Sequence, residues 1–325
     1  MIVMPIDPPT LQLDISELVD WLELTALFSE FGIARIDSLM GSLRQLSEEQ
    51  EEDIGEEDRA IEEIIDGIEA EVEKRSRHLE VTYPFKLGEG AEELSIVEDW
   101  NAEVYSFYLV ALIASHVTKS PILNTPPSEA LITRLRNRVF QILSTLALAG
   151  LANGPAVSVG WPRVSGEALT DLLQRASEAG AGFTVRVPPG QYIAPREKDG
   201  GIDIIAWGRE VEPPPAILYF GQVASGRNWE EKPVGENART FIDNYLHDIM
   251  VGNHGHATII PFRIWDDRKW KSEHRVHRAL LERLRLPAKA YRGLELSREG
   301  VLVDEADQIG IVINWLEEYR NEVLH

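Results

Sequence analysis

The stretch "DGGIDIIAWGREVEPPPAILYFGQVASG", from Asp199 to Gly226, contains two short apolar runs that are joined by a charged, proline-rich loop. Short apolar runs bounded by turn residues predict buried strands. A carboxylate, Asp203, stands inside the first strand, and an amide, Gln222, stands late in the second. Burying either group is costly unless it has a partner or a chemical role, so both are candidate site residues.

The composition indicates a folded protein with no membrane-spanning part. The chain has 325 residues, of which 44% are hydrophobic, and this length predicts two domains. The longest apolar run, "FYLVALIASHV", is too short to cross a bilayer, and the first residues lack the pattern of a signal peptide. The absence of cysteine excludes disulfides, cysteine-based zinc sites and a cysteine nucleophile. We therefore expect a cytoplasmic protein without a membrane partner, and a homo-oligomer remains open.

The formal net charge of −22 is concentrated in the N-terminal part of the chain. Residues 1–130 hold 29 acidic and 8 basic side chains, whereas residues 131–325 hold 25 acidic and 24 basic ones. A nearly neutral C-terminal part can still carry a basic groove that binds phosphate. The most acidic segment, residues 45–80, is interpreted either as the solvated face of a bundle helix or as a DNA-mimicking helix or one that binds a basic partner. We do not expect it to touch DNA, because like charges repel phosphate.

The segment "KSPILNTPPSE" predicts a domain boundary at about residue 125. We expect residues 1–125 to form an acidic, mainly helical domain. Residues 126–325 alternate between helical and strand patterns, which predicts an α/β layered domain. Its first helix is expected over residues 128–150, with Gly150 at its end.

The order of a helix, the "DGGID" strand, a loop and the "GQVASG" strand resembles the PD-(D/E)xK, or restriction-endonuclease-like, nuclease superfamily, over roughly residues 130–265. The longer string "DGGIDIIAW…GQVASGRNW" also resembles a group of uncharacterised bacterial proteins. The resemblance implies a restriction-endonuclease-like α/β core. It also implies Mg²⁺-dependent hydrolysis of DNA, with prokaryotic defence against foreign DNA as one setting.

The family pattern assigns roles to particular positions of this chain. By this resemblance Asp203 matches the metal-binding aspartate, Gln222 matches the second metal ligand, and Val223 offers its backbone carbonyl. The implied Mg²⁺ neutralises a phosphodiester and lowers the pKa of a bound water. The preceding helix often bears a glutamate in such folds, and Gln141 stands at the matching position here.

The pattern breaks at the position of the family's lysine, where this chain has Ala224. A methyl group neither binds phosphate nor activates water. Under one hypothesis another cation replaces the lysine, and Lys232 is the first candidate. The other candidates from the same region are Arg227 and Lys198 as cations that also contact nucleic acid, Trp229 as a further nucleic-acid contact, and Glu230 or Glu231 as a second carboxylate.

Two alternatives to an active nuclease stay open. Under the first, the fold has lost its chemistry and serves as a nucleic-acid-binding or scaffolding subunit of a multi-protein system. Under the second, "DGGID" is a turn at the entry to a strand, and its aspartate caps a neighbouring backbone group.

Overall fold

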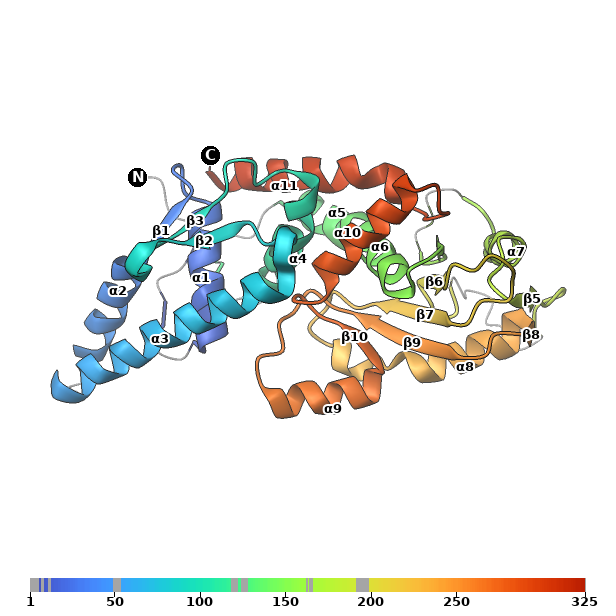
Figure 1. The fold of residues 1–325 in the computed structure, drawn as a ribbon, viewed down its shortest axis with the longest axis horizontal. Coiled ribbons are helices and arrows are strands. Elements are labelled where there is room, and N and C mark those ends of the chain that lie inside the picture. The colour runs from blue at the N-terminus through green and yellow to red at the C-terminus, as the bar shows by residue number, and fades with distance from the viewer. Residues whose placement is uncertain are drawn as a thin grey trace. The chain divides into compact units, whose positions relative to one another are not determined.

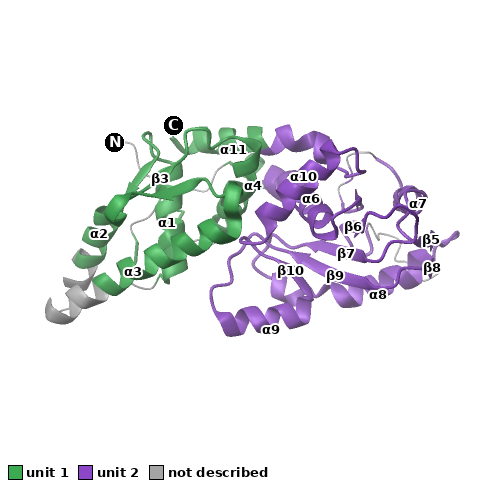
Figure 2. Ribbon diagram, in the orientation of Figure 1, with its two compact units in different colours: residues 1–132, 313–325 green, residues 133–312 purple. Residues whose placement is uncertain are grey.

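The computed structural model divides into two compact units, which are coloured separately in Figure 2. It describes residues 6, 9–10, 13–48, 54–117, 122–123, 128–161, 163, 166–190 and 199–324, without the side chains of residues 45–48 and 54–61. Unit 1 comprises residues 1–132 and 313–325, and unit 2 comprises residues 133–312. The expected boundary at residue 125 lies outside the described residues. The division after residue 132, and the grouping of residues 313–325 with unit 1, differ from the expected limits of 1–125 and 126–325.

Unit 1 is mainly helical and also contains a small antiparallel sheet with strand order β1-β3-β2. Its helices and strands are α1 (Ile15–Leu27), β1 (Ile33–Arg35), α2 (Ile36–Glu48), α3 (Ile54–Leu79), β2 (Phe85–Leu87), β3 (Glu93–Ile96), α4 (Glu103–His116), most of α5 (Glu129–Arg134) and most of α11 (Ile309–Leu324).

A buried charge network lies inside unit 1. The fully buried guanidinium of Arg75 contacts the carboxylates of Asp20 at 2.7 Å, Glu23 at 2.9 Å and Glu71 at 3.1 Å. Tyr108 donates its hydroxyl hydrogen to Glu23 at 2.7 Å. Buried charges are tolerated when they are paired in this way, so the network helps to define how the helices of unit 1 pack.

Unit 2 alternates helices and strands (Figure 1). After a π-helical segment (Leu135–Val139), its elements are α6 (Phe140–Ala152), β4 (Ala156–Ser158), α7 (Leu169–Glu178), β5 (Phe183–Val185), β6 (Ile204–Trp207), β7 (Leu218–Val223), α8 (Val234–Tyr245), β8 (Leu246–Ile249), β9 (His254–Ile259), α9 (Asp267–His277), β10 (Ala279–Leu281), α10 (Leu286–Arg298) and the start of α11 (Ile309–Leu324). The expected mixed α/β architecture is confirmed.

The main sheet has five strands in the order β10-β9-β7-β6-β4. Strands β4, β6 and β7 pair antiparallel, and β7, β9 and β10 run parallel to one another. The carboxyl ends of β4, β7, β9 and β10 therefore meet at the edge of the sheet where β6 begins. Asp203 directly precedes β6, and this edge is called the Asp203 edge below.

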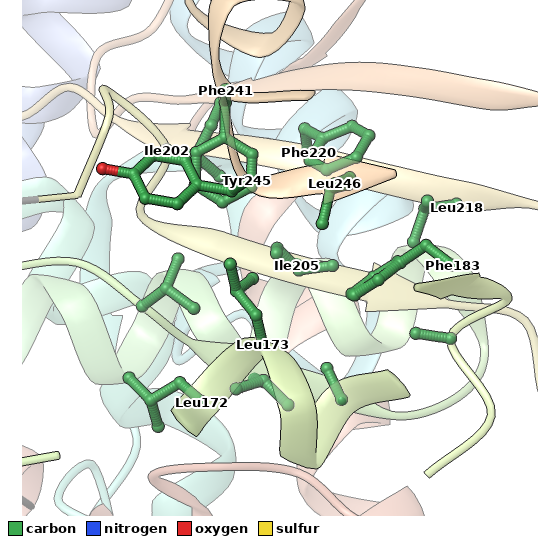
Figure 3. Close-up of a cluster of buried hydrophobic side chains, with 14 of the residues drawn as sticks. Leu172, Leu173, Phe183, Ile202, Ile205, Leu218, Phe220, Phe241, Tyr245 and Leu246 are labelled. Carbon is green, nitrogen blue, oxygen red and sulfur yellow. The ribbon is translucent and has the colours of Figure 1, made fainter. Parts of the chain in front are cut away.

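The two faces of the sheet are covered by different helices. Helix α6 packs on one face with α10 behind it, and α8 and α9 lie on the other face (Figure 1). Alternating residues of the strands, such as Ile205 in β6 and Phe220 in β7, point toward α8, where they join Phe241 in a buried cluster (Figure 3). This period-2 pattern sets which face each side chain at the strand ends occupies.

No helix within the described ranges combines the length and the apolar character that a bilayer crossing requires.

Candidate functional site

The "DGG" triplet forms a tight turn that leads the chain into β6. Gly200 and Gly201 both have positive φ angles, of 62° and 77°, which side chains with a Cβ adopt at a cost. The N–H of Gly201 donates to Oδ1 of Asp199 at 3.0 Å. Asp199 therefore caps a backbone group, as aspartates in turns do, whereas the backbone of Asp203 bonds to the neighbouring strands.

Asp203 is held by hydrogen bonds to the two neighbouring strands, β4 and β7. Its N–H donates to the carbonyl of Gly221 at 2.9 Å, and its own carbonyl accepts from the N–H groups of Val159 and Gly160 at 2.8 and 2.9 Å. Its Oδ2 accepts a hydrogen bond from the N–H of Val223 at 2.8 Å. The carboxylate is therefore held in one position between β4 and β7.

Gly160, which follows β4, leaves the space that the carboxylate of Asp203 occupies. A Cβ at position 160 would lie 2.8 Å from Oδ1 of Asp203, closer than non-bonded atoms approach. The family-matched Gln141 of α6 is also close, because its Nε2 donates to the Asp203 carbonyl at 3.3 Å and to Oγ of Ser158 at 3.1 Å. Gln141 thus positions the backbone of Asp203.

Gln222 lies on β7, directly after Gly221. The register pairs Gly221 with Ile204, and the N–H of Asp203 also donates to the carbonyl of Gly221. Alternation along β7 places Gln222 on the same face as Phe220, toward α8. Oε1 of Gln222 is buried and has no hydrogen-bond partner among the described residues. A buried carboxylate and a buried carbonyl oxygen without a hydrogen-bond partner among the described residues thus both belong to the Asp203 edge.

The environment of Asp203 favours its protonated form. Burial raises the pKa of this carboxyl from its ordinary value of 3.8 to about 7, and the nearby negative charge of Asp199 acts in the same direction. The hydrogen bond from the Val223 N–H and the positive charge of Lys232 lower the pKa of Asp203, but by less. Asp203 as a whole residue is partly exposed, whereas its carboxylate is closely surrounded by protein atoms.

Lys232 is the predicted cation that the structure brings within electrostatic range of Asp203. It is exposed and follows the short 3-10 helix η4 (Trp229–Glu231) after β7. Lys198, another predicted cation, lies outside the described residues. Arg227 has its guanidinium 5.0 Å from the ring centroid of Phe262.

The position of the family's lysine is closed by packing. Ala224 is 3% exposed and belongs to an apolar cluster with Trp229, Ile260, Phe262, Ile264 and Leu280. The expectation that Trp229 contacts nucleic acid does not fit its burial, since it is only 5% exposed and its ring lies against His277 at 5.1 Å between centroids. Trp229 instead closes the apolar cluster over Ala224.

The predicted second carboxylates are not part of this constellation. Glu230 forms an ion pair with Lys269 of α9 at 2.6 Å, and Glu231 is exposed. Asp199, the first aspartate of "DGGID", is the carboxylate whose charge acts on Asp203. The Asp-Gly-Gly turn that it begins is the signal in the sequence that identifies it. The interaction that Val223 supplies is made by its N–H.

Arg163 is a further residue that sequence reasoning missed. Its Nε donates to the carbonyl of Val159 at 3.1 Å, beside the carbonyl of Asp203, and the charge of Asp199 acts on its guanidinium. It follows β4 on the Asp203 edge. Its separation of 40 residues from Asp203 in the sequence hid this proximity.

The donor set suits a single oxygen-bound cation. Within the described part of the chain, no group of three or more His, Cys, Asp or Glu residues could hold a metal ion. What the Asp203 edge offers is one buried carboxylate, the unpaired amide oxygen of Gln222 and a second carboxylate, Asp199, close enough to act on the first. Oxygen donors of this kind are the ligands of hard cations such as Mg²⁺.

No family model, curated protein or solved structure matches the chain.

Proposed function

We propose that the chain is a restriction-endonuclease-like phosphodiesterase that acts on DNA and uses one divalent cation at Asp203 and Gln222. The elements that carried the family resemblance occur in unit 2 in the same order, since α6 precedes β4, α7 and β5, after which "DGGID" leads into β6 and "GQV" ends β7. The strands β6 and β7 are direct neighbours. Both matched residues therefore reach one edge of one sheet.

The observation that supports the proposal concerns two buried oxygen donors at the Asp203 edge. Oε1 of Gln222 has no hydrogen-bond partner among the described residues, and burial disfavours the charged carboxylate of Asp203. An unpaired buried carbonyl oxygen costs about 1–3 kcal/mol, and a buried carboxylate is disfavoured in its charged form. A cation between Asp203 and Gln222 would offset both costs. Such pairs of perturbed polar groups are typical of functional sites.

Each residue at the Asp203 edge would have its own role in phosphodiester hydrolysis. When bound, Mg²⁺ supplies charge neutralisation at the phosphate and acidifies a water. Asp203 and Gln222 would hold the ion, and the Val223 N–H and the Asp203 backbone contacts would keep the carboxylate oriented. Lys232 would offset negative charge on the phosphate from the exposed side of the site.

The test is a cleavage assay on supercoiled plasmid and on single-stranded circular DNA with 5 mM Mg²⁺ or Mn²⁺, with wild type beside Asp203→Asn. This substitution keeps the shape and an oxygen acceptor for the Val223 N–H but removes the charge. Glu231→Gln is the matched control, because it removes an exposed carboxylate of the neighbouring segment. We expect cleavage by wild type and the control and none by Asp203→Asn. Equal cleavage by all three proteins would overturn the assignment of Asp203.

A second candidate function follows from the burial of Ala224 in an apolar cluster. A site built without room for a lysine at this position suits a nucleic-acid-binding subunit that performs no hydrolysis. The same assay separates the two functions, since DNA binding by wild type without cleavage in either metal favours the binding subunit.

A further inference from the structure

Arginine side chains lie over aromatic rings at the Asp203 edge of the sheet. The distances from the guanidinium carbon to the ring centroid are 5.6 Å for Arg163 and Trp161, 5.8 Å for Arg263 and Trp265, and 5.0 Å for Arg227 and Phe262. In the first two pairs the arginine and the tryptophan are two residues apart in the sequence. Arginine–aromatic combinations of this kind bind bases by stacking and phosphates by charge.

The strand order places the two tryptophans on opposite sides of the candidate site. Trp161 follows β4, and Trp265 follows β9, whereas Asp203 and Gln222 belong to the two strands between them, β6 and β7. All four segments end or begin at the same edge, as the hydrogen bonds from Gly160 to Asp203 and from Ala224 to Ile259 show. Three spacings between strands separate β4 from β9, or about 14 Å. The two tryptophans thus follow the strands that lie on either side of β6 and β7.

Both indole rings are exposed to solvent. Trp161 is 53% exposed and Trp265 is 40% exposed, whereas Trp207 and Trp229 of the same unit are at most 5% exposed. Large exposed apolar groups that gather beside a candidate site mark binding surfaces. A nucleotide is the ligand that matches an exposed indole next to an arginine, because its base offers a flat π-face to the ring and its phosphate a negative charge to the cation.

The charge near Trp265 also favours a polyanion. Residues 263–285 hold eight basic and four acidic side chains, a net of +4 from eight minus four, in a chain whose formal net charge is −22. On α9 and at its end, Arg268, Arg275 and Arg278 are exposed. A local positive surface on an acidic protein raises the concentration of nucleic acid at that surface alone.

We propose that the Asp203 edge binds single-stranded DNA, with one base stacked on Trp161, another on Trp265, and the intervening phosphates passing Asp203. The proposal rests on the proposed function, because it names the substrate class of the same site. In a duplex the faces of the bases are stacked on one another, and a protein reaches phosphates and groove edges instead. Two exposed indole rings therefore have no stacking partner in intact duplex DNA, whereas every unpaired base offers one.

The test measures binding in EDTA, so that it does not depend on cleavage. Fluorescence anisotropy with a labelled 16-nucleotide oligo(dT), and with a 16-base-pair duplex, gives the affinity of wild type, Trp161→Ala, Trp265→Ala and Phe31→Ala. Phe31 is the matched control, because it is an aromatic residue 83% exposed in unit 1. We expect each tryptophan variant to bind oligo(dT) about 5- to 150-fold more weakly than wild type, as the loss of one stacked base predicts. The affinity of each tryptophan variant for the duplex, and the affinity of Phe31→Ala for oligo(dT), should differ from wild type by less than twofold.

Salt dependence tests the charged half of the proposal. The slope of log affinity against log salt concentration for oligo(dT) should fall in magnitude by about 0.7 in Arg163→Gln, which is the contribution of one phosphate contact to a single strand. An unchanged slope would show that Arg163 does not contact a phosphate of the bound strand. Circular dichroism confirms that each variant is folded, as expected for substitutions of exposed residues.

The outcomes separate this inference from the nuclease proposal. Tryptophan variants that bind oligo(dT) as tightly as wild type, or a wild type that prefers the duplex, would overturn the single-strand inference even if plasmid is cleaved. Tight, tryptophan-dependent binding of oligo(dT) by a wild type that cleaves nothing would overturn the nuclease proposal and support the stacking surface.

Discussion

Replacing Asp203 by asparagine should make the metal-free protein more stable at high pH. The folded-state pKa of about 7 lies above the ordinary value of 3.8, so between these values the folded protein binds a proton that the unfolded chain has released. Folding stability contributed by this group therefore falls as the pH rises from about 4 to about 7. A pKa difference of about three corresponds to roughly 4 kcal/mol, reached in full above pH 7. Asparagine has no charge to bury and avoids this cost.

The assay is urea unfolding followed by tryptophan fluorescence, in EDTA, at pH 5, 6, 7 and 8. From pH 5 to pH 8 the stability of Asp203→Asn relative to wild type should increase by roughly 2.5 kcal/mol. Comparing the two proteins at each pH cancels the titration of every other group. Glu231→Gln serves as the control for the loss of one negative charge.

Two results would refute the reasoning. A stability difference between Asp203→Asn and wild type that stays constant from pH 5 to pH 8 would mean that the carboxylate is not disfavoured in the folded state. A cation site at Asp203 further requires that 10 mM Mg²⁺ stabilise wild type at pH 8 and leave Asp203→Asn unchanged, because a ligand stabilises only the state that binds it.

Four further substitutions test the site and the units separately. Lys232→Ala should abolish cleavage with a change of melting temperature below about 2 °C, since the residue is exposed, and full activity would exclude it as the replacing cation. Ala224→Lys should lower the free energy of unfolding by more than about 3 kcal/mol without adding activity, because the position is buried among apolar side chains, and a folded variant with increased cleavage would contradict this. Gly160→Ala should reduce Mg²⁺ binding, measured by calorimetry, because its Cβ would displace Oδ1 of Asp203; unchanged binding would contradict the geometry. Arg75→Met should destabilise unit 1 by about 3–5 kcal/mol in thermal unfolding, since three buried carboxylates lose their partner, and a loss below 1 kcal/mol would show that the network is not maintained.

The sequence predicted the elements that carry the site, because their signals are local. Two apolar runs with turn residues between them become the neighbouring strands β6 and β7. The mixed α/β class followed from alternating patterns in the same way. Signals of this kind are contained in a window of a dozen residues, so they are readable without the fold.

Other features depended on contacts between distant segments. The expected helix end at Gly150 is wrong, since α6 continues to Ala152, and Gly150 serves close packing against α10, where a Cβ would lie 1.9 Å from the carbonyl oxygen of Lys289. The burial of Trp229 over Ala224 depends on β9 and the segment after it. The approach of Arg163 to the Asp203 edge likewise requires the pairing of β4 with β6.

The two functional hypotheses make opposite demands on Asp203. A subunit that only binds nucleic acid has no use for a carboxylate whose burial opposes its charge at neutral pH, because an asparagine would fill the same space and still accept the Val223 N–H. A hydrolase needs that charge, since a neutral amide binds Mg²⁺ weakly and Gln222 is already neutral. The glycine at position 160 leaves room for Oδ1, and the cation of Lys232 partly opposes the effect of burial on the pKa of Asp203. If the chain is the proposed hydrolase, the burial of Ala224 predicts that the positive charge near the phosphate comes from the segment after β7 instead of from β7 itself.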